Sequence, residues 1–238
     1  MEMKIGCCGF PLVKEKYAAR FSVVEVQQTF YQPPRISTLE RWRSFVPADF
    51  EFTLKAWQIL THPAGCPTYR RLKTDLSGKE RQECGSFQPT SIVGEAWETT
   101  RLCAKALKAR LLLFQCPPSF TPSPENVRNM RRFFSSVDRD GLKFLWEPRG
   151  AWPDDLVRSL CEELNLIHAV DPFVSRTVTP EFIYFRLHGG KGFKHVYSDE
   201  ELQRLAEMIS EAPAYVMFNN IRMLDDATRF QHALQEVQ

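Results

Sequence analysis

Residues 111–147 read LLLFQCPPSFTPSPENVRNMRRFFSSVDRDGLKFLWE, and this stretch decides the fold. Its two ends are short apolar runs, of the kind found in parallel strands that are buried on both faces. Between them, Ser123 and Pro124 supply an N-cap and a first-turn proline for a helix predicted over Asn126–Ser136. The stretch therefore predicts two parallel strands joined by a helical crossover.

The same alternation continues in both directions along the chain. Apolar runs bounded by polar clusters predict eight strands, at Met3–Cys8, Val23–Gln27, Phe50–Ala56, Leu111–Gln115, Lys143–Glu147, Ile167–Val170, Phe182–Leu187 and Tyr215–Asn219. Besides the helix already named, helical patterns predict helices over Lys14–Arg20, from Ser37 onward, over Ala96–Leu107, from Pro153 toward Leu164, from Ser198 to Ser210 and from Asp225 toward Val237.

This order of elements predicts one fold above the others. Eight alternating units in 238 residues are typical of a single domain, residues 1–238, folded as a (β/α)8 TIM barrel. An open doubly wound sheet is the alternative, but no Gly-x-Gly-x-x-Gly sequence follows any of the strands. We therefore expect the closed barrel.

Two of the predicted helices begin with a capping box. Ser37 is followed by Glu40, and Ser198 is followed by Glu201, at the spacing that this motif requires. In a capping box the Ser hydroxyl and the Glu carboxylate each accept a hydrogen bond from a backbone amide at the helix start. We therefore expect Ser37 and Ser198 to be N-caps.

A long insertion follows the third predicted strand. Residues 57–91 are rich in Pro, Gly, Cys and Arg, and a loop of this length in a compact domain is usually functional or mobile. Because it starts at the carboxyl end of a strand, we expect it to lie over the mouth of the barrel as a lid. Cys66 and Cys84 lie within it and are the one pair that could form a disulfide or a metal clip, although reduced thiols are expected throughout.

The composition is that of an ordinary globular protein. Hydrophobic residues make up 43% of the chain, charged residues 25%, and the formal net charge is +2. No run of four or more Lys and Arg occurs, so charge does not favour a nucleic-acid partner. No apolar run approaches the ~20 residues of a membrane span, and neither a signal-peptide pattern nor a Cys-x-x-Cys motif is present. These features predict a cytoplasmic protein without a membrane partner.

Charged and polar residues occur at the carboxyl ends of nearly all the predicted strands. They are Glu25, Gln27, Lys55, Gln115, Glu147, Arg149, Asp171, Arg186, His188, Asn219 and Asn220. Active sites of (β/α)8 barrels lie at this end, and a carboxylate inside an apolar strand must be paired or shift its pKa. We therefore expect six of these residues to meet in one cavity: Glu25, Lys55, Glu147, Arg149, Asp171 and His188. A buried ion-pair network that only closes the barrel is the alternative reading.

This set of residues allows acid–base chemistry on a small molecule. The three carboxylates could act as general acid and general base once their neighbours separate their pKa values. The cations Lys55, Arg149 and Arg186 could hold a phosphate or carboxylate group. Lys55 could also form a Schiff base, and His188 could hold a divalent metal with a carboxylate. Because the histidines show no regular ligand spacing, neither a metal nor a cofactor is expected.

Several motifs resemble one known family over nearly the whole chain. They are IGCCGF at 5–10, VVEVQQTFYQPP at 23–34, FEFTLKAWQILTH at 50–62, LLFQCPPSF at 112–120, WEPRGAW at 146–152, FIYFRLHGG at 182–190, YSD at 197–199 and FNN at 218–220. On these motifs the chain resembles the YecE-like family, also called domain of unknown function 72. The resemblance implies a (β/α)8 barrel without a settled activity.

The resemblance also implies a set of site residues. The family's characteristic polar positions fall on the catalytic candidates Glu25, Lys55, Glu147, Asp171 and His188, on Gly189, and on the substrate-binding candidates Thr29, Tyr31, Gln115, Arg149, Arg186, Tyr197, Asn219 and Asn220. Two stretches depart from the family pattern. Many relatives have Thr-Ser-Gly-Trp at residues 7–10 and Asn-Ser at 27–28, where this chain has Cys-Cys-Gly-Phe and Gln-Gln. If the first loop touches the ligand, specificity differs in this chain.

Three classes of function fit these features. We expect foremost an enzyme, a hydrolase or isomerase, that acts on a small anionic or sugar-like substrate with an Arg/Lys anion clamp. A nucleic-acid-binding or repair protein is the first alternative, since the family is distantly similar to endonuclease IV and sugar-isomerase barrels. The metal-binding residues of those enzymes are not matched here. A non-catalytic ligand sensor is the second alternative.

Overall fold

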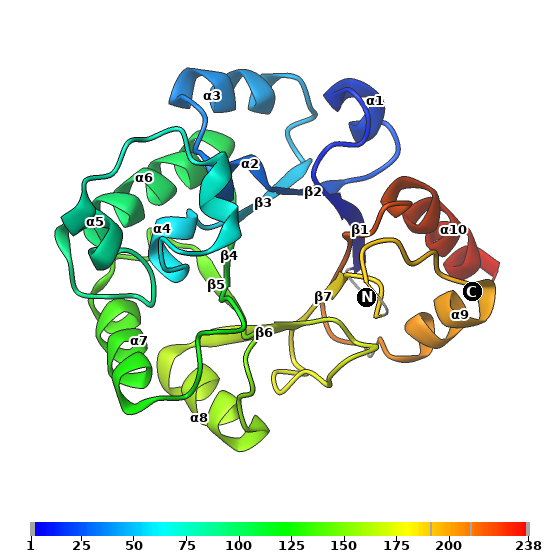
Figure 1. Ribbon diagram of the computed structural model, residues 1–238. Helices are drawn as coiled ribbons and strands as arrows, with labels where there is room; N and C mark the ends of the chain where they lie inside the picture. Colours follow the sequence, from blue (N-terminus) through cyan, green and yellow to red (C-terminus); the bar gives the residue numbers. More distant parts are fainter. Residues whose placement is uncertain (1–2, 191, 210, 237–238) are drawn as a thin grey trace.

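The eight predicted strands form a closed parallel barrel in sequence order (Figure 1). The computed structural model describes residues 3–190, 192–209 and 211–236. The strands are β1 Met3–Cys8, β2 Val23–Val26, β3 Glu51–Lys55, β4 Leu111–Gln115, β5 Lys143–Glu147, β6 Leu166–Val170, β7 Ile183–Leu187 and β8 Ala214–Phe218. Parallel pairing of β1 with β8 closes the barrel, with Met3 opposite Ala214 and Cys7 opposite Phe218. The (β/α)8 prediction is confirmed, and no strand end differs from its prediction by more than one residue.

Helices surround the barrel on its outside (Figure 1). The helices of the described residues are α1 Lys14–Ala18, α2 Gln28–Tyr31, α3 Ile36–Ser44, α4 Gln58–Thr61, the 3-10 helix η1 Pro67–Arg71, α5 Gly78–Glu83, α6 Ser91–Leu107, α7 Pro124–Ser136, α8 Asp154–Leu164, α9 Asp199–Glu207 and α10 Met223–Glu236. The alternation is not strict, since residues 171–182, all of them described, join β6 to β7 without a helix. Pro172 and Pro180 interrupt this short connection and disfavour a helix there.

Two of the three predicted N-caps are confirmed, and one is wrong. Ser198 and Glu201 form the capping box of α9, and the Ser123 hydroxyl accepts a hydrogen bond from the amide of Asn126 at the start of α7. Helix α3 instead begins at Ile36 with Arg35 at its N-cap, so Ser37 already lies in the first turn and caps nothing.

Some predicted helix ends also shift. Helix α6 begins at Ser91, five residues before the predicted start, and α10 begins at Met223. Helix α9 ends at Glu207, and the predicted ends of the last two helices, Ser210 and Val237, lie outside the described residues.

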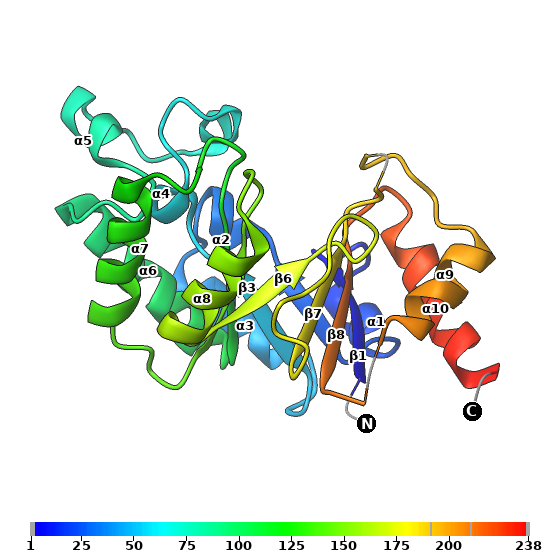
Figure 2. The same cartoon turned by 90° about the horizontal axis from the view of Figure 1, so that it is seen from below.

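The insertion at 57–91 is structured rather than a bare loop. It contains α4, η1 and α5 and lies on the carboxyl side of the barrel, beside α6 and α7 (Figure 2). Phe87 anchors it, because its ring packs against Phe114 at 5.9 Å and Phe133 at 5.2 Å between centroids. The predicted face is therefore right. All seven cysteines are free, so Cys66 and Cys84 do not form a disulfide in this structure.

The interior of the barrel changes from apolar to polar along the strands. Its lower part is a buried cluster that includes Val23, Leu113, Leu145, Tyr184 and Met217. Side chains two apart on a strand point the same way. The next inward positions toward the carboxyl ends are therefore polar: Glu25, Gln115, Glu147, Arg186 and Asn219. The strands thus bring the predicted site residues into one layer.

The described helices include none that is both long and apolar enough to cross a membrane.

Candidate functional site

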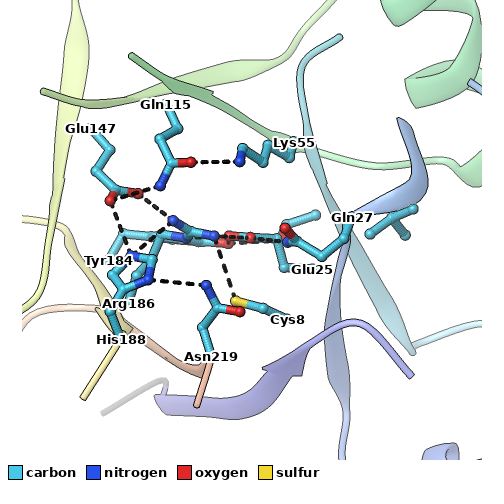
Figure 3. A network of polar contacts seen from close by, with 12 residues as sticks. Cys8, Glu25, Gln27, Lys55, Gln115, Glu147, Tyr184, Arg186, His188 and Asn219 are labelled. Carbon is cyan, nitrogen blue, oxygen red and sulfur yellow. Dashed lines mark hydrogen bonds and ion pairs between the residues drawn. The ribbon is translucent and has the colours of Figure 1, made fainter. Parts of the chain in front are cut away.

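Arg186 lies at the centre of the polar layer (Figure 3). It extends from β7 and is fully buried. Its Nη2 and Nε atoms donate to the two carboxylate oxygens of Glu25 on β2, at 2.7 and 3.0 Å. Its Nη1 atom donates to Glu147 on β5. One guanidinium therefore holds two carboxylates from strands that are not neighbours in the barrel.

Glu25 is fully buried and yet remains ionised. Burial by itself raises the pKa of the Glu25 carboxyl, but the charge and hydrogen bonds of Arg186 outweigh this effect and hold the pKa below its ordinary value. The Tyr184 hydroxyl adds a donated hydrogen bond of 2.9 Å, and Gln27 adds another from its side-chain amide. These donors therefore keep Glu25 charged against both burial and the like charge of Glu147.

Glu147 is also paired with Arg186, but it lies at the outer side of the network. Its Oε1 atom accepts hydrogen bonds from Gln115 Nε2 at 3.0 Å, Arg149 Nη1 at 2.9 Å and His188 Nε2 at 3.0 Å. Burial alone raises the pKa of Glu147, but the charge of Arg186 and the contacts with His188 and Arg149 hold it well below the ordinary value. Glu147 is thus a carboxylate that stays ionised in an almost dry site.

Lys55 is buried behind this network. Its Nζ atom donates to Gln115 Oε1 at 2.5 Å and lies 3.5 Å from the ring centroid of Phe30. Burial, together with the nearby charge of Arg186, lowers the pKa of Lys55 to about 7. Lys55 therefore contacts Gln115 and Phe30 in the interior of the barrel.

His188 links Glu147 to the next strand ends. Its Nδ1 atom lies 3.0 Å from Asn219 Nδ2, and its Nε2 atom lies 3.0 Å from Glu147 Oε1 and 3.1 Å from the donor Arg186 Nη1. With the Asn219 amide donating to Nδ1, the neutral ring carries its proton on Nε2, beside Glu147. The backbone amide of His188 donates to Asp171 Oδ2 at 3.0 Å. Burial raises the pKa of Asp171, and the backbone hydrogen bonds from Phe173 and His188 offset this only in part. The two carboxyl groups beside His188 are therefore shifted in opposite directions.

An open cavity of about 480 Å³ lies next to this part of the network. It is lined by the residues that follow β5, β6, β7 and β8, and four expected residues reach it together: Glu147, Arg149, Asp171 and His188. Asn219 also lines it. Glu25, Lys55, Gln115 and Arg186 lie in the barrel interior instead. No residue of the insertion at 57–91 lines this cavity, so the insertion does not act as its lid in this structure.

Four residues taken from the family resemblance serve the surrounding structure. The Thr29 hydroxyl donates to the backbone carbonyl of Lys55 at 2.7 Å, and the Tyr31 ring is covered by Arg71. The Tyr197 hydroxyl accepts a hydrogen bond from the amide of Gly189 at 2.7 Å, which fixes the turn after β7. The Asn220 amide donates to Asp226 and to the carbonyl of His195. These four side chains do not line the cavity.

Sequence reasoning missed several residues of the site, among them Tyr184, Cys8 and Val174. Tyr184 donates to Glu25, and Cys8 lies 3.7 Å from Arg186 Nη2. Tyr184 stands two residues before Arg186, so the period of a strand could have found it. Val174 lines the cavity from the connection after β6, and no pattern in the sequence marks it.

The donor set does not fit a metal ion. Within the described parts of the chain, no group of three or more His, Cys, Asp or Glu side chains is arranged to hold one. The guanidinium of Arg186 already occupies the space between Glu25 and Glu147 and supplies the positive charge there. A cation at that place would meet Arg186 rather than open carboxylate oxygens.

Comparison with known proteins identifies the family. The pattern of the family described as "Protein of unknown function DUF72" matches residues 14–238. The chain belongs to the DUF72 family. A curated relative, the UPF0759 protein YunF of Bacillus subtilis (strain 168), is 24% identical over 249 aligned positions, which cover 87% of this chain and 79% of YunF.

Solved structures agree with this family fold. A DUF72 family protein of Enterococcus faecalis V583 is 22% identical, and the alignment covers 98% of each chain with a TM-score of 0.74. A xylose isomerase domain-containing protein of Salmonella typhimurium LT2 is 14% identical over 98% of this chain and 96% of its own, with a TM-score of 0.57. This DUF72 protein therefore has the fold of the xylose isomerase-like TIM barrels.

Proposed function

We propose that this DUF72 protein is an enzyme that acts on a small sugar-like substrate bound in the cavity beside β5–β8. One observation carries the proposal: Glu147 and Asp171 line the same cavity, and their surroundings lower one pKa and raise the other. Two carboxyl groups with separated pKa values are the equipment of paired acid–base catalysis.

The residues have distinct roles in this proposal. Asp171, with its raised pKa, exchanges a proton with the substrate. Glu147 remains ionised and orients the Nε2–H of His188, while Asn219 fixes the other side of the ring. The hydroxyl groups of a sugar match these short polar side chains, because each hydroxyl both donates and accepts hydrogen bonds.

The charge of the lining narrows the substrate class. Arg186 and Lys55 do not reach the cavity, and Arg149 is the one Arg or Lys among the described residues of its lining. Its side chain is 41% exposed and donates to Glu147 through Nη1, which leaves donors for one phosphate or carboxylate group. Glu147, Asp154 and Asp171 line the same cavity and repel further negative charge. A sugar with at most one anionic group therefore fits better than a polyanion, in keeping with the fold shared with xylose isomerase-like proteins.

The test is proton exchange on candidate substrates. Aldoses, ketoses and their acid or monophosphate derivatives are incubated with the protein in D2O, and NMR follows deuterium entering beside the carbonyl; aryl glycosides are tested for cleavage in parallel. We expect turnover of at least one compound, and its loss in Asp171→Asn. Asp138→Asn is the matched control, because the Asp138 carboxylate also accepts the amide two residues on, but at an exposed position.

Two results would contradict the proposal. The first is equal turnover, or equal absence of turnover, in the parent, Asp171→Asn and Asp138→Asn proteins. The second is salt-dependent retention of the protein on oligonucleotides at physiological ionic strength, which would favour a nucleic-acid-binding function.

A further inference from the structure

Large apolar side chains are exposed at the edge of the polar cavity. Val174, after β6, is 70% exposed, and Phe193, after β7, is 60% exposed. Both line the cavity together with Glu147 and Asp171. Single exposed apolar residues are common on protein surfaces, but these two border the same polar cavity.

One backbone hydrogen bond ties Phe193 to the segment that follows β8. Its carbonyl accepts a hydrogen bond of 2.8 Å from the amide of Ile221, which follows β8 and is itself 55% exposed. Gly192 precedes it with a φ of 118°, a conformation that side chains with a Cβ rarely adopt. The segment after β7 rises above the carboxyl side of the barrel (Figure 2). The backbone of Phe193 is therefore tied to the residues after β8, and its side chain lines the cavity while 60% exposed.

The cavity is also larger than its polar part requires. Its volume of about 480 Å³ falls within the ~300–1,000 Å³ of typical ligand pockets and exceeds the size of one sugar ring. The polar groups Glu147, Asp171 and His188 gather at the strand ends, whereas Val174 and Phe193 stand on the connections above them. A ligand that fills the cavity can therefore contact the polar groups at the strand ends and these two exposed apolar side chains together.

We infer that the substrate carries an apolar, aryl-type substituent on its sugar-like part, and that this substituent binds against Val174 and Phe193. The inference rests on the proposed function and adds the substrate class. An aromatic group gains both from leaving water and from offset or edge contact with the Phe193 ring. The sugar-like part then lies toward Asp171 and His188, where the proton transfer takes place.

Calorimetric titration of matched ligands tests the inference. The methyl and phenyl glycosides of the same sugar are titrated into the parent protein, and phenol is titrated as the apolar part alone. We expect the phenyl glycoside to bind about tenfold more tightly than the methyl glycoside, and we expect Phe193→Ala and Val174→Ala to remove this difference without weakening the methyl glycoside. Val13→Ala is the matched control, since Val13 is 61% exposed and does not line the cavity.

The outcomes separate this inference from the proposed function. Equal binding of the two glycosides overturns the inference and leaves the proposed function in place. Binding of phenol that depends on Phe193, without binding of either glycoside, supports the apolar site and counts against the sugar-like substrate. Sedimentation of the parent protein as a dimer that Phe193→Ala dissociates would make this surface a contact between two copies and overturn the inference.

Discussion

The guanidinium of Arg186 and the carboxylate of Glu25 are joined by two hydrogen bonds, of 2.7 and 3.0 Å, at a place where neither side chain is exposed to solvent. A buried pair of this kind contributes little net stability, because both charges lost their hydration when the chain folded. Removing one partner is a different matter, since the other charge is then left in a dry interior. Arg186 has two such partners, because it also binds Glu147.

We therefore expect Arg186→Met to be among the most destabilising substitutions in the barrel. It leaves Glu25 and Glu147 buried without their cation, and a broken buried pair costs about 3–5 kcal/mol. Urea unfolding measures the loss. Arg131→Met is the control, because the Arg131–Glu163 pair is about half exposed and should contribute less than about 1 kcal/mol. Similar losses in the two variants would show that Arg186 is not the centre of the network.

Glu147 and Arg149 should differ sharply in their effect on stability, although they contact each other at 2.9 Å. Glu147→Gln removes a charge that Arg186 needs, so we expect a loss of about 3–5 kcal/mol. Arg149→Met removes a side chain that is 41% exposed, so we expect a loss below about 1 kcal/mol. Thermal melts compare them, and a large drop in Tm for both would assign Arg149 to the structural network.

The buried Lys55 should make stability depend on pH. Its pKa falls from 10.5 to about 7 on folding, so between these values the unfolded chain binds more protons at this site than the folded chain does. Stability at this site therefore rises with pH across that window. Urea unfolding at pH 6, 8 and 10 measures this effect. The free energy of unfolding of the parent protein should rise relative to that of Lys55→Met as the pH rises. Lys143→Met is the control, because Lys143 also lies over a phenylalanine ring but is exposed. A parent-minus-variant difference that does not change with pH would contradict the prediction.

The hydrogen bonds of His188 predict its tautomer. With Asn219 donating to Nδ1, the neutral ring carries its proton on Nε2, facing Glu147. Nitrogen NMR of labelled histidine should therefore report the Nε2–H form in the parent protein, and a mixture of tautomers in Asn219→Leu. The Nδ1–H form in the parent protein would mean that the Asn219 amide is turned the other way.

Two serines in similar sequence contexts should respond differently to alanine. Ser198 caps α9, so Ser198→Ala should lose about 1 kcal/mol in urea unfolding. Ser37 lies inside the first turn of α3 and makes no cap. Because alanine favours a helix, Ser37→Ala should not lower the free energy of unfolding. A loss for Ser37→Ala equal to that for Ser198→Ala would restore Ser37 as the cap of its helix.

These serines show where sequence reasoning succeeded and where it could not. Strands such as Leu111–Gln115 and Lys143–Glu147 were predicted to the residue, because strands buried on both faces are continuous apolar runs. The start of α3 was not, because the capping-box spacing also occurs within a first turn. A further capping box, at Ser77 and Glu80, was not predicted, because it lies in the insertion, where no apolar periodicity indicates a helix.

The sequence could predict that a layer of polar residues lies at the carboxyl ends of the strands, but not which of these residues contact each other. A charge such as Glu25 or Arg186 inside an apolar strand indicates a buried polar centre, since a lone charge cannot stay there. Which residues meet depends on distances across the barrel, as when Arg186 on β7 reaches β2 and β5. No local pattern contains those distances, so Lys55 was placed in the cavity by its strand position although its partner is Gln115.

The interlocked centre also limits how proteins with this architecture can change. Arg186, Glu25 and Glu147 come from three strands, and exchanging any one of them passes through an intermediate with a stranded charge. Arg149, Val174 and Phe193 stand at the solvent edge, where a single substitution alters stability by only about 0.5 kcal/mol. Single substitutions that change the substrate are therefore tolerated at the edge of the cavity but not among the three central charges. We expect related proteins to differ at the edge and to keep the buried charged centre.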